Sequence, residues 1–396
     1  MEGFLLDWAN LLLRWLHVIV AIAWIGSSFY FVWLDNHLRA PTDPALKNKG
    51  VGGELWAVHG GGFYNPQKYL GAPPKLPGEL HWFYWESYST WMSGFALFTV
   101  VYLANPRAFL IDPNVAALTP TAAVVLALAF LVVGWFVYDL LCRMLEKKEG
   151  LLACLVVAFV TIASWAACNL FAGRAAFLIV GAMIATIMSA NVFFWIIPGQ
   201  RKTVAAMEAG IPVDPIHGQR GKQRSVHNPY FTLPVLFSML SNHYSMTYSH
   251  QYNWVILVVI MVSGVLIRQF FILRHKGVMN PVYPSAAVAL LGAVLAVTMP
   301  EKADPNVAQA ASEPVSIAKV QQVMNDRCIQ CHAAQTTMMP TAAKGILLDN
   351  AESVKTNAQL IYQQVVLQKA MPLGNSTQMT EAERALIKNW FESGAH

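Results

Sequence analysis

The chain of 396 residues is 56% hydrophobic and only 12% charged, with a mean hydropathy of +0.42. Soluble globular chains carry about 25% charged residues, so this composition excludes an ordinary soluble protein and indicates that most of the chain lies in lipid. The net charge of +5 does not indicate a nucleic-acid partner, because the basic residues lie in loops beside apolar runs, where they set the orientation of membrane helices.

Eight apolar stretches approach the length of about 20 residues that a membrane-spanning helix needs. They are residues 8–33, 82–104, 121–142, 151–171, 175–197, 230–248, 252–273 and 284–299. The sixth is the weakest, since its second half is polar and it contains Pro234, so it is either a span facing the bundle interior or a partly re-entrant segment. The prediction is therefore about eight spans, with seven as the alternative.

Positive charge falls in alternate loops between these stretches. The basic loops are residues 34–81, 143–150, 198–229 and 274–283. The positive-inside bias places them in the cytoplasm, so both termini are expected on the other side. Seven spans would put basic loops on opposite sides, which favours eight. The acidic start MEGFLLD lacks the cationic region of a cleavable signal peptide, so none is expected.

The first span carries two ionisable residues, Arg14 and His17, which are three positions apart and so share one helical face. A lone His is more often a core residue than a ligand, but an ionisable residue inside a membrane favours a functional role. The stretch RWLHVIVAIAWIG resembles the opening helix of the copper-resistance-D-like and haem-binding membrane oxidase group. That resemblance implies a haem b ligated by His17, with Arg14 on a propionate, and His243 in the sixth stretch is the expected second ligand.

The loop after the first span gathers polar and aromatic residues on the predicted cytoplasmic side. GGELWAVHGGGFY contains Glu54 and His59, and HWFYWESY contains His81 and Glu86. An aromatic belt with a flexible loop explains the Trp and Tyr residues, but not Glu86 inside the span or the glycine run beside His59. The alternative is a concave polar site that stacks a planar heterocycle, with these four residues as acid–base candidates.

The composition changes after Pro300, which divides the chain into a membrane domain (residues 1–300), an Ala- and Pro-rich linker (301–316) and a small soluble domain (317–396). The soluble domain begins with an amphipathic helix and ends with a helix opened by a capping box of Thr380 and Glu383. The stretch ESVKTNAQLIYQQVVLQ is expected to form a helix between them.

DRCIQCHAAQ, in this last domain, contains the tag by which haem is attached covalently. Cys328 and Cys331 lie on one turn for two thioether bonds, and His332 is free to reach the iron. A zinc site needs four ligands, and the domain offers only the terminal His396 in addition. We therefore expect one covalent haem c. Such haems are assembled outside the cytoplasm, in agreement with the predicted position of the C-terminus.

The sixth ligand of an electron-transfer haem c is usually Met. The stretch KAMPLGN supplies Met371 and resembles the Met-Pro-x-Gly-Asn ligand loop of class I cytochromes c. Met338, Met339 and Met379 are rivals, but none lies in such a turn. The expected fold is all-α: a membrane helix bundle of about eight spans, followed by a small all-α cytochrome c domain.

The stretches GGELWAVHGGGFY, HWFYWESYSTWMSGF and NHYSMTYSHQYNW, followed by the haem tag, resemble the bacterial membrane-bound, cytochrome c-linked urate oxidase family over nearly the whole chain. The resemblance implies purine catabolism at the inner membrane, with the cytochrome c domain in the periplasm. It implies oxidation of urate to 5-hydroxyisourate, with electrons leaving through haem c instead of reducing oxygen directly. A terminal cytochrome c oxidase or a soluble cytochrome c is the expected acceptor.

Urate is a planar anion near neutral pH, so its oxidation needs a base and cationic or hydrogen-bonding groups. A cytoplasmic site and an external haem would lie about 30 Å apart, too far for one tunnelling step, so a haem b at His17 and His243 is the simplest relay. A urate site buried near mid-membrane would relax the need for such a relay. Two alternatives remain: a membrane cytochrome that oxidises another small molecule such as quinol, and a non-enzymatic anchor for cytochrome c. About eight spans with intramembrane His and Glu residues exceed what an anchor needs.

Overall fold

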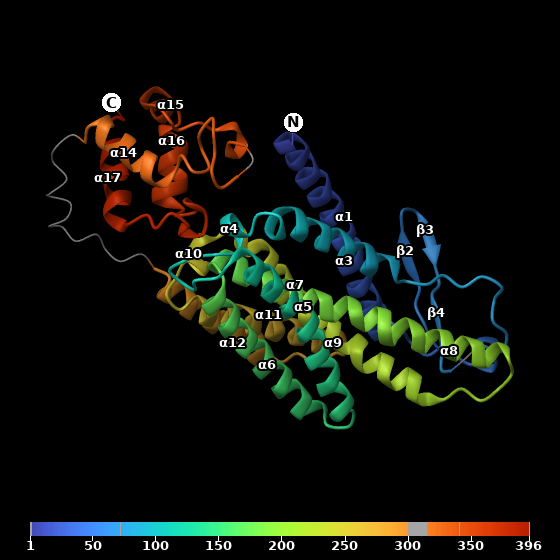
Figure 1. The fold of residues 1–396 in the computed structure, drawn as a ribbon. Helices are drawn as coiled ribbons and strands as arrows, with labels where there is room; N and C mark the ends of the chain where they lie inside the picture. The colour runs from blue at the N-terminus through green and yellow to red at the C-terminus, as the bar shows by residue number, and fades with distance from the viewer. Residues whose placement is uncertain (1, 72, 300–314, 340, 396) are drawn as a thin grey trace.

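The structure is a computed structural model that describes residues 2–71, 73–299, 315–339 and 341–395 (Figure 1). The predicted linker 301–316 therefore lies almost entirely outside the described residues. Most of the described chain is helical, with a helix bundle formed by the first three quarters of the sequence and a separate small helical unit at the C-terminal end.

Each of the eight predicted apolar stretches contains a helix. The bundle helices are α1 (Glu2–His37), α3 (Trp85–Phe98), α5 (Pro120–Met144), α6 (Glu149–Leu170), α7 (Gly173–Ala190), α9 (Pro215–Leu240), α11 (Asn253–His275) and α12 (Val282–Val297). A π-helical segment η1 (Thr99–Leu103) extends α3, and a second one, η2 (Asn191–Ile196), joins α7 to α8 (Ile197–Glu208). Within the described residues, five helices are long and apolar enough to cross a membrane: Phe4–His37, Pro120–Met144, Glu149–Leu170, Gly173–Glu208 and Asn253–His275.

The sixth helix differs from the prediction of 230–248. Helix α9 begins 15 residues earlier, because the Asp214 side chain accepts a hydrogen bond from the Ile216 N–H and Pro215 occupies the first helical position. It ends at Leu240, and the chain continues as the 3₁₀ turn η3 (Ser241–His243) and the short helix α10 (Ser245–Tyr248). The polar half of the predicted span is thus a turn.

Helix α7 forms the centre of the bundle. It packs against α5, α6 and α9, and most of its side chains are buried. Small residues permit this close approach: a Cβ on Gly134 of α5 would lie 2.4 Å from the Met183 side chain, and one on Gly181 would lie 2.5 Å from Ser238 of α9. Close contact at small residues is how helices associate in lipid, where apolar burial between helices supplies little driving force.

The loop between α1 and α3 is not the flexible segment that the sequence suggested, and the fold is not purely α-helical. Strand β1 (Val51–Glu54) pairs with β4 (Gln67–Tyr69), and β2 (Ala57–His59) pairs with β3 (Gly62–Tyr64). Gly60 and Gly61 form the tight turn of the β2–β3 hairpin at φ of +59° and +80°, a conformation that favours glycine. The hairpin turn therefore explains two of the three consecutive glycines.

The C-terminal unit has its own hydrophobic core. Its elements are α14 (Ile317–Arg327), η4 (Ala343–Gly345), α15 (Ala351–Thr356), α16 (Ala358–Ile361), η5 (Tyr362–Leu367), η6 (Leu373–Asn375) and α17 (Glu381–Glu392). Helices α14 and α17 pack together around the buried Trp390. The predicted capping box is confirmed, since Thr380 and the Glu383 side chain exchange hydrogen bonds at the start of α17.

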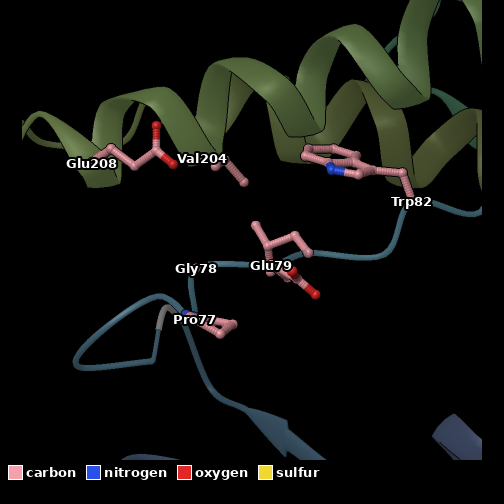
Figure 2. Close-up of a pocket in the computed structure, with 7 residues that line it drawn as sticks. Pro77, Gly78, Glu79, Trp82, Val204 and Glu208 are labelled. Carbon is pink, nitrogen blue, oxygen red and sulfur yellow. The ribbon is translucent and has the colours of Figure 1, made fainter.

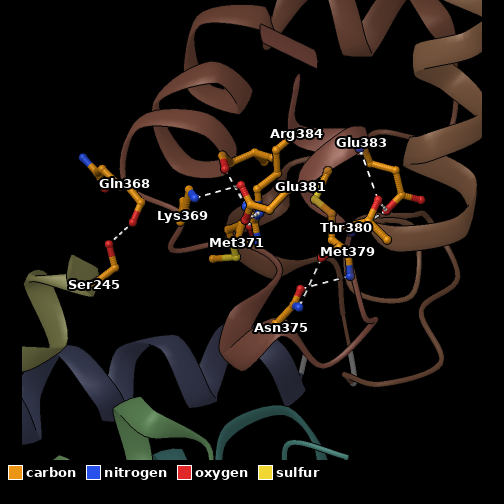
Figure 3. Close-up of polar contacts among 11 residues, drawn as sticks. Ser245, Gln368, Lys369, Met371, Asn375, Met379, Thr380, Glu381, Glu383 and Arg384 are labelled. Atoms are coloured by element: carbon orange, nitrogen blue, oxygen red, sulfur yellow. Dashed lines mark hydrogen bonds and ion pairs between the residues drawn. The ribbon is translucent and has the colours of Figure 1, made fainter. Parts of the chain in front are cut away.

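The C-terminal unit contacts one end of the helix bundle. The Ser245 hydroxyl of α10 donates to the Gln368 carbonyl (Figure 3), and a Cβ on Gly374 would lie 3.1 Å from the Ala172 side chain. The start of α1 lies at this same end, whereas the β-ribbons and the α8–α9 hairpin lie at the other (Figure 1). We call these the tail end and the ribbon end of the bundle.

Candidate functional site

The predicted haem-binding residues lie where the first helix of the C-terminal unit ends. Helix α14 stops at Arg327, and the backbone N–H groups of Cys331 and His332 both donate to the Cys328 carbonyl, at 3.1 and 2.9 Å. This turn keeps the two thiols and the imidazole together. Burial raises the pKa of Cys328 to about 12 and also raises that of Cys331, so both groups are thiols at neutral pH.

His332 is oriented as a metal ligand would be. Its Nδ1 lies 3.2 Å from the Ile346 carbonyl, so an Nδ1–H group donates there and Nε2 keeps its lone pair. Burial lowers the pKa of His332 despite this hydrogen bond, so the ring is neutral at physiological pH. A neutral imidazole whose second nitrogen is held by a carbonyl suits a metal ligand.

Met371 lies in the loop before α17, half-buried against the core of the C-terminal unit (Figure 3). Arg384 fixes the loop by donating from Nη1 to the Met371 carbonyl at 2.8 Å and to the Val365 carbonyl. The rival Met379 is buried in the hydrophobic core. Two thiols, a neutral His, a positioned Met and an apolar surround fit a haem c.

His17, the predicted haem b ligand, faces α3. Its Nδ1 lies 3.1 Å from both the Thr90 carbonyl and the Ser93 hydroxyl. The ring fits closely because residue 94 is glycine: a Cβ there would lie 2.8 Å from His17 Cε1. Nδ1 is thus engaged in helix packing, while Nε2 has no hydrogen bond in the described part of the chain.

The other two residues of the predicted haem b site are placed differently from the expectation. His243 is exposed at the end of the 3₁₀ turn η3, beyond the α-helix, because α9 ends at Leu240. Arg14 is exposed and donates to the Asn10 side chain at 3.1 Å. No hydrogen bond joins His17 to His243 among the described residues, so a shared haem b stays a prediction.

The four acid–base candidates at the ribbon end are not linked to one another. Glu54 accepts from the Asn65 side chain at 3.0 Å, and His59 is exposed beside the hairpin turn. His81 is exposed with its ring edge on Phe83, and Glu86 lies in the first turn of α3, where a carboxylate is favoured by the helix dipole. No hydrogen bond or ion pair joins any two of the four across the described ranges.

A surface cavity of about 520 Å³ lies at the ribbon end between the loop before α3 and helix α8 (Figure 2). Its lining residues are Pro77, Gly78, Glu79, Leu80, Trp82, Val204 and Glu208. Glu79 and Glu208 approach the space from opposite walls, and no basic side chain lines it. Two carboxylates repel an anion, so this cavity does not suit an anionic substrate.

The structure also contains a buried ionic cluster that the sequence analysis missed. Asp139 of α5 is 4% exposed and receives three side-chain donors: Arg143 Nε at 2.6 Å, Trp195 Nε1 at 2.7 Å and Arg224 Nη2 at 2.9 Å. Arg224, on α9, is 2% exposed. Asp139 is the one acidic residue in the apolar stretch 121–142, and a carboxylate inside a predicted span is the signal that would have found the cluster.

A hydrogen-bonded layer continues from this cluster toward the centre of the bundle. The Tyr138 hydroxyl lies 2.7 Å from His227 Nδ1, and Asn191 donates from Nδ2 to the Tyr138 hydroxyl at 3.2 Å and to Asn228 Oδ1 at 3.1 Å. The layer joins α5, η2 and α9. Its hydroxyl, imidazole and amide groups bond mainly to one another, which is typical of a structural polar network, although Asn191 Oδ1 has no partner among the described residues.

A family model described as "Urate oxidase N-terminal" matches residues 3–299, about three quarters of the chain. The chain belongs to this family. No curated protein and no solved structure matches the chain significantly. The matched region is the helix bundle with its β-ribbons, and it ends before the C-terminal unit.

Membership of the urate oxidase N-terminal family makes this protein a urate-oxidase-related oxidoreductase whose family-defining part is the helix bundle. The C-terminal unit lies outside the match, so the prediction that it binds haem depends on its own residues.

Proposed function

We propose that this protein is a membrane-bound urate oxidase whose C-terminal unit is a cytochrome c. The bundle oxidises urate to 5-hydroxyisourate, and the electrons leave to a periplasmic acceptor such as a soluble cytochrome c or a terminal oxidase. The observation that carries the proposal is the combination of two parts in one chain: a bundle of the urate oxidase N-terminal family, and a contacting unit with the ligand set Cys328, Cys331, His332 and Met371.

The overall reaction balances without oxygen. Urate and one water molecule become 5-hydroxyisourate, with release of two protons and two electrons. A haem c held by the two thioether bonds, His332 and Met371 would accept electrons one at a time. The chain itself must bind the anion, remove protons and exclude competing solvent chemistry.

The position of the C-terminal unit supports electron exit at the tail end. It contacts the bundle through Ser245 and Gln368, at the end opposite to the ribbons and the basic α8–α9 hairpin. By the positive-inside bias, the basic end faces the cytoplasm and the tail end faces the periplasm of an inner membrane.

A haem b inside the bundle is a second part of the proposal. His17 supports it, because its Nδ1 is hydrogen-bonded to α3 and its Nε2 carries no hydrogen bond among the described residues. This is the arrangement in which a His ligand is held by a group behind it. Exposed His243, in a turn at the tail end, is the weaker of the two proposed ligands.

The direct test is anaerobic reduction of purified holoprotein in lipid nanodiscs. Urate is expected to reduce the c-type haem, with two reducing equivalents released for each 5-hydroxyisourate formed. A quinol added in place of urate leaves the haem oxidised if urate is the substrate. Haem that stays oxidised in excess urate, yet is reduced by dithionite, would overturn the proposed function.

A further inference from the structure

Arg268 is a buried cation within a membrane-length helix, two turns before its C-terminal end. It lies on α11, its residue is 5% exposed, and its Nε and Nη2 atoms are buried without a hydrogen-bond partner in the described structure. A charge in this position is costly unless a counter-charge or hydrogen-bond acceptors compensate it. Ionisable groups inside spans therefore point to function.

The other buried arginines of the described chain have carboxylate partners. Arg224 is 2% exposed and lies 2.9 Å from Asp139, and Arg384 is 6% exposed and lies 3.6 Å from Glu381. No carboxylate among the described residues lies within ion-pair distance of Arg268. Among these buried arginines, Arg268 is therefore the one whose charge an anionic ligand would neutralise.

The geometry around Arg268 suits a planar anion. The guanidinium carbon lies 4.2 Å from the ring centroid of Phe29 on α1, so the cation lies over the face of an aromatic ring. The two unpartnered nitrogens, Nε and Nη2, form one edge of the guanidinium, the fork that binds two neighbouring acceptors at once. Tyr230 of α9 is close enough to interact electrostatically, and its hydroxyl donates to Gln269.

The line of contact between α1 and α11, which we call the seam, runs from Phe29 and Arg268 to the ribbon end of the bundle. His275 lies seven residues after Arg268, two helical turns along the same face, and its ring is 5.5 Å from that of His37 on α1. The Nδ1 atom of His275 is also buried without a partner in the described structure. Helix α1 packs chiefly against α3 and contacts α9 and α11 much less, so this seam is the less closely packed side of α1.

We propose that Arg268, with Phe29 beside it, binds the urate anion within the cytoplasmic half of the bundle, and that His37 and His275 flank its access. This inference rests on the proposed function and names the substrate site. The urate monoanion carries a carbonyl oxygen beside a deprotonated ring nitrogen along one edge, and these two acceptors match the two donors of the Nε–Nη2 fork. The acidic surface cavity at Glu79 and Glu208 offers no such group.

The site also shortens the electron path. Phe29 and His17 are both on α1, 12 residues apart, which corresponds to about 18 Å along the helix axis. His17 thus lies between Arg268 and the tail end of the bundle. Urate bound at Arg268 is closer to the C-terminal unit than urate bound at the ribbon surface.

The test measures urate binding and turnover in Arg268→Gln and Arg268→Lys holoproteins in nanodiscs, with Arg274→Gln as the control. Arg274 is an exposed arginine on the same helix. Binding is measured by equilibrium dialysis on protein reduced with dithionite, so that no turnover occurs. Turnover is measured as anaerobic haem reduction, and the Soret spectrum with the thermal midpoint reports folding.

Arg268→Gln is expected to weaken urate binding and raise KM by about 10- to 100-fold, because charged hydrogen bonds are lost. Arg274→Gln should change both by less than about twofold, as expected for an exposed charge. Arg268→Lys keeps the buried charge but not the fork, so we expect it to fold and still bind weakly. Full binding by folded Arg268→Lys and Arg268→Gln would overturn the inference while leaving the proposed function intact. Wild-type protein that neither binds nor oxidises urate would overturn both.

Discussion

In the C-terminal unit, His332 and Met371 are each held by a hydrogen bond to a residue outside the short motif in which they lie. The Ile346 carbonyl holds the His332 ring, and Arg384 holds the Met371 carbonyl from α17, thirteen residues further along. The Cys-x-x-Cys-His spacing predicted the attachment site, because one turn of chain determines it. The support for the Met371 loop comes from a later helix, so it required the structure.

Replacement of Met371 tests the sixth ligand. Met371→His is expected to lower the reduction potential of the haem c by on the order of 100 mV, because a Met ligand raises the potential relative to His. Potentiometric titration of the purified protein measures it. Met379→Leu is the control, since Met379 is buried in the core, and it should leave the potential unchanged. Equal potentials for Met371→His and the wild type would show that Met371 is not the ligand.

Two buried residues show how polar positions within spans were overlooked. Asp139 and Arg268 both lie inside predicted apolar stretches, yet neither was among the candidate site residues predicted from the sequence. Because mean hydropathy is averaged over a whole span, a single charged residue changes it little and is easily missed. Burial and partner geometry separate the two cases, since Asp139 is satisfied by three donors whereas Arg268 lacks a counter-charge among the described residues.

At the scale of elements, helix α7 depends on glycine contacts with its neighbours. Gly181→Val is expected to destabilise the bundle by about 1 to 3 kcal/mol, because the new side chain overlaps Ser238 on α9 and forces the helices apart. Gly292→Val on α12 is the matched control, as no atom lies within 4 Å of a Cβ there. The apparent thermal midpoint in detergent measures the difference. Equal midpoints for the two variants would contradict this account of α7 packing.

The capping box of α17 predicts an acid sensitivity of the C-terminal unit. Burial opposes ionisation of Glu383, but hydrogen bonds from the Thr380 N–H and from Arg327 outweigh it and hold the pKa of Glu383 below its ordinary 4.5. A lowered folded-state pKa stabilises the fold above pH 4.5, and this stabilisation is lost as the pH falls through the folded-state value.

Glu383→Gln should therefore lower the free energy of unfolding at neutral pH. It should also make the loss of stability below pH 4.5 less steep. Acid unfolding followed by the Soret band measures both effects. Glu352→Gln, at an exposed position on α15, is the control and should keep the wild-type profile. If the stability of Glu383→Gln fell below pH 4.5 as steeply as that of the wild type, this role of Glu383 would be refuted.

At the scale of the whole molecule, charge and architecture agree on one orientation. The basic residues of the α8–α9 hairpin, among them Arg201 and Lys222, lie at the ribbon end, and the C-terminal unit lies at the other (Figure 1). An anionic purine would enter from the basic side, and electrons would leave on the side where c-type haems are assembled. The two ends thus have separate tasks.

This orientation can be tested with single reporter cysteines in a Cys154→Ser background. If the C-terminal unit faces the periplasm as proposed, Lys388→Cys on α17 should react with a membrane-impermeant maleimide in intact spheroplasts. Lys222→Cys on α9 should react only after the membrane is permeabilised. Both lysines are exposed, so equal accessibility after permeabilisation serves as the control. Labelling of Lys222→Cys in intact spheroplasts would reverse the proposed topology.

The sequence alone predicted a helix in each apolar stretch and the capping box, and the structure confirms both, because each depends on residues within a few turns of one another. The same local pattern predicts the membrane position and the haem tag. It misplaced the sixth helix, since Asp214 and Pro215 start α9 well before the apolar run. The three-dimensional structure was needed to show that Gly60 and Gly61 form the turn of a hairpin and that His17 packs on Gly94. It also showed that Arg268 is buried beside Phe29 of α1 without a described carboxylate partner. These are contacts between helices or strands brought together by packing, and local pattern carries no information about which surfaces will meet.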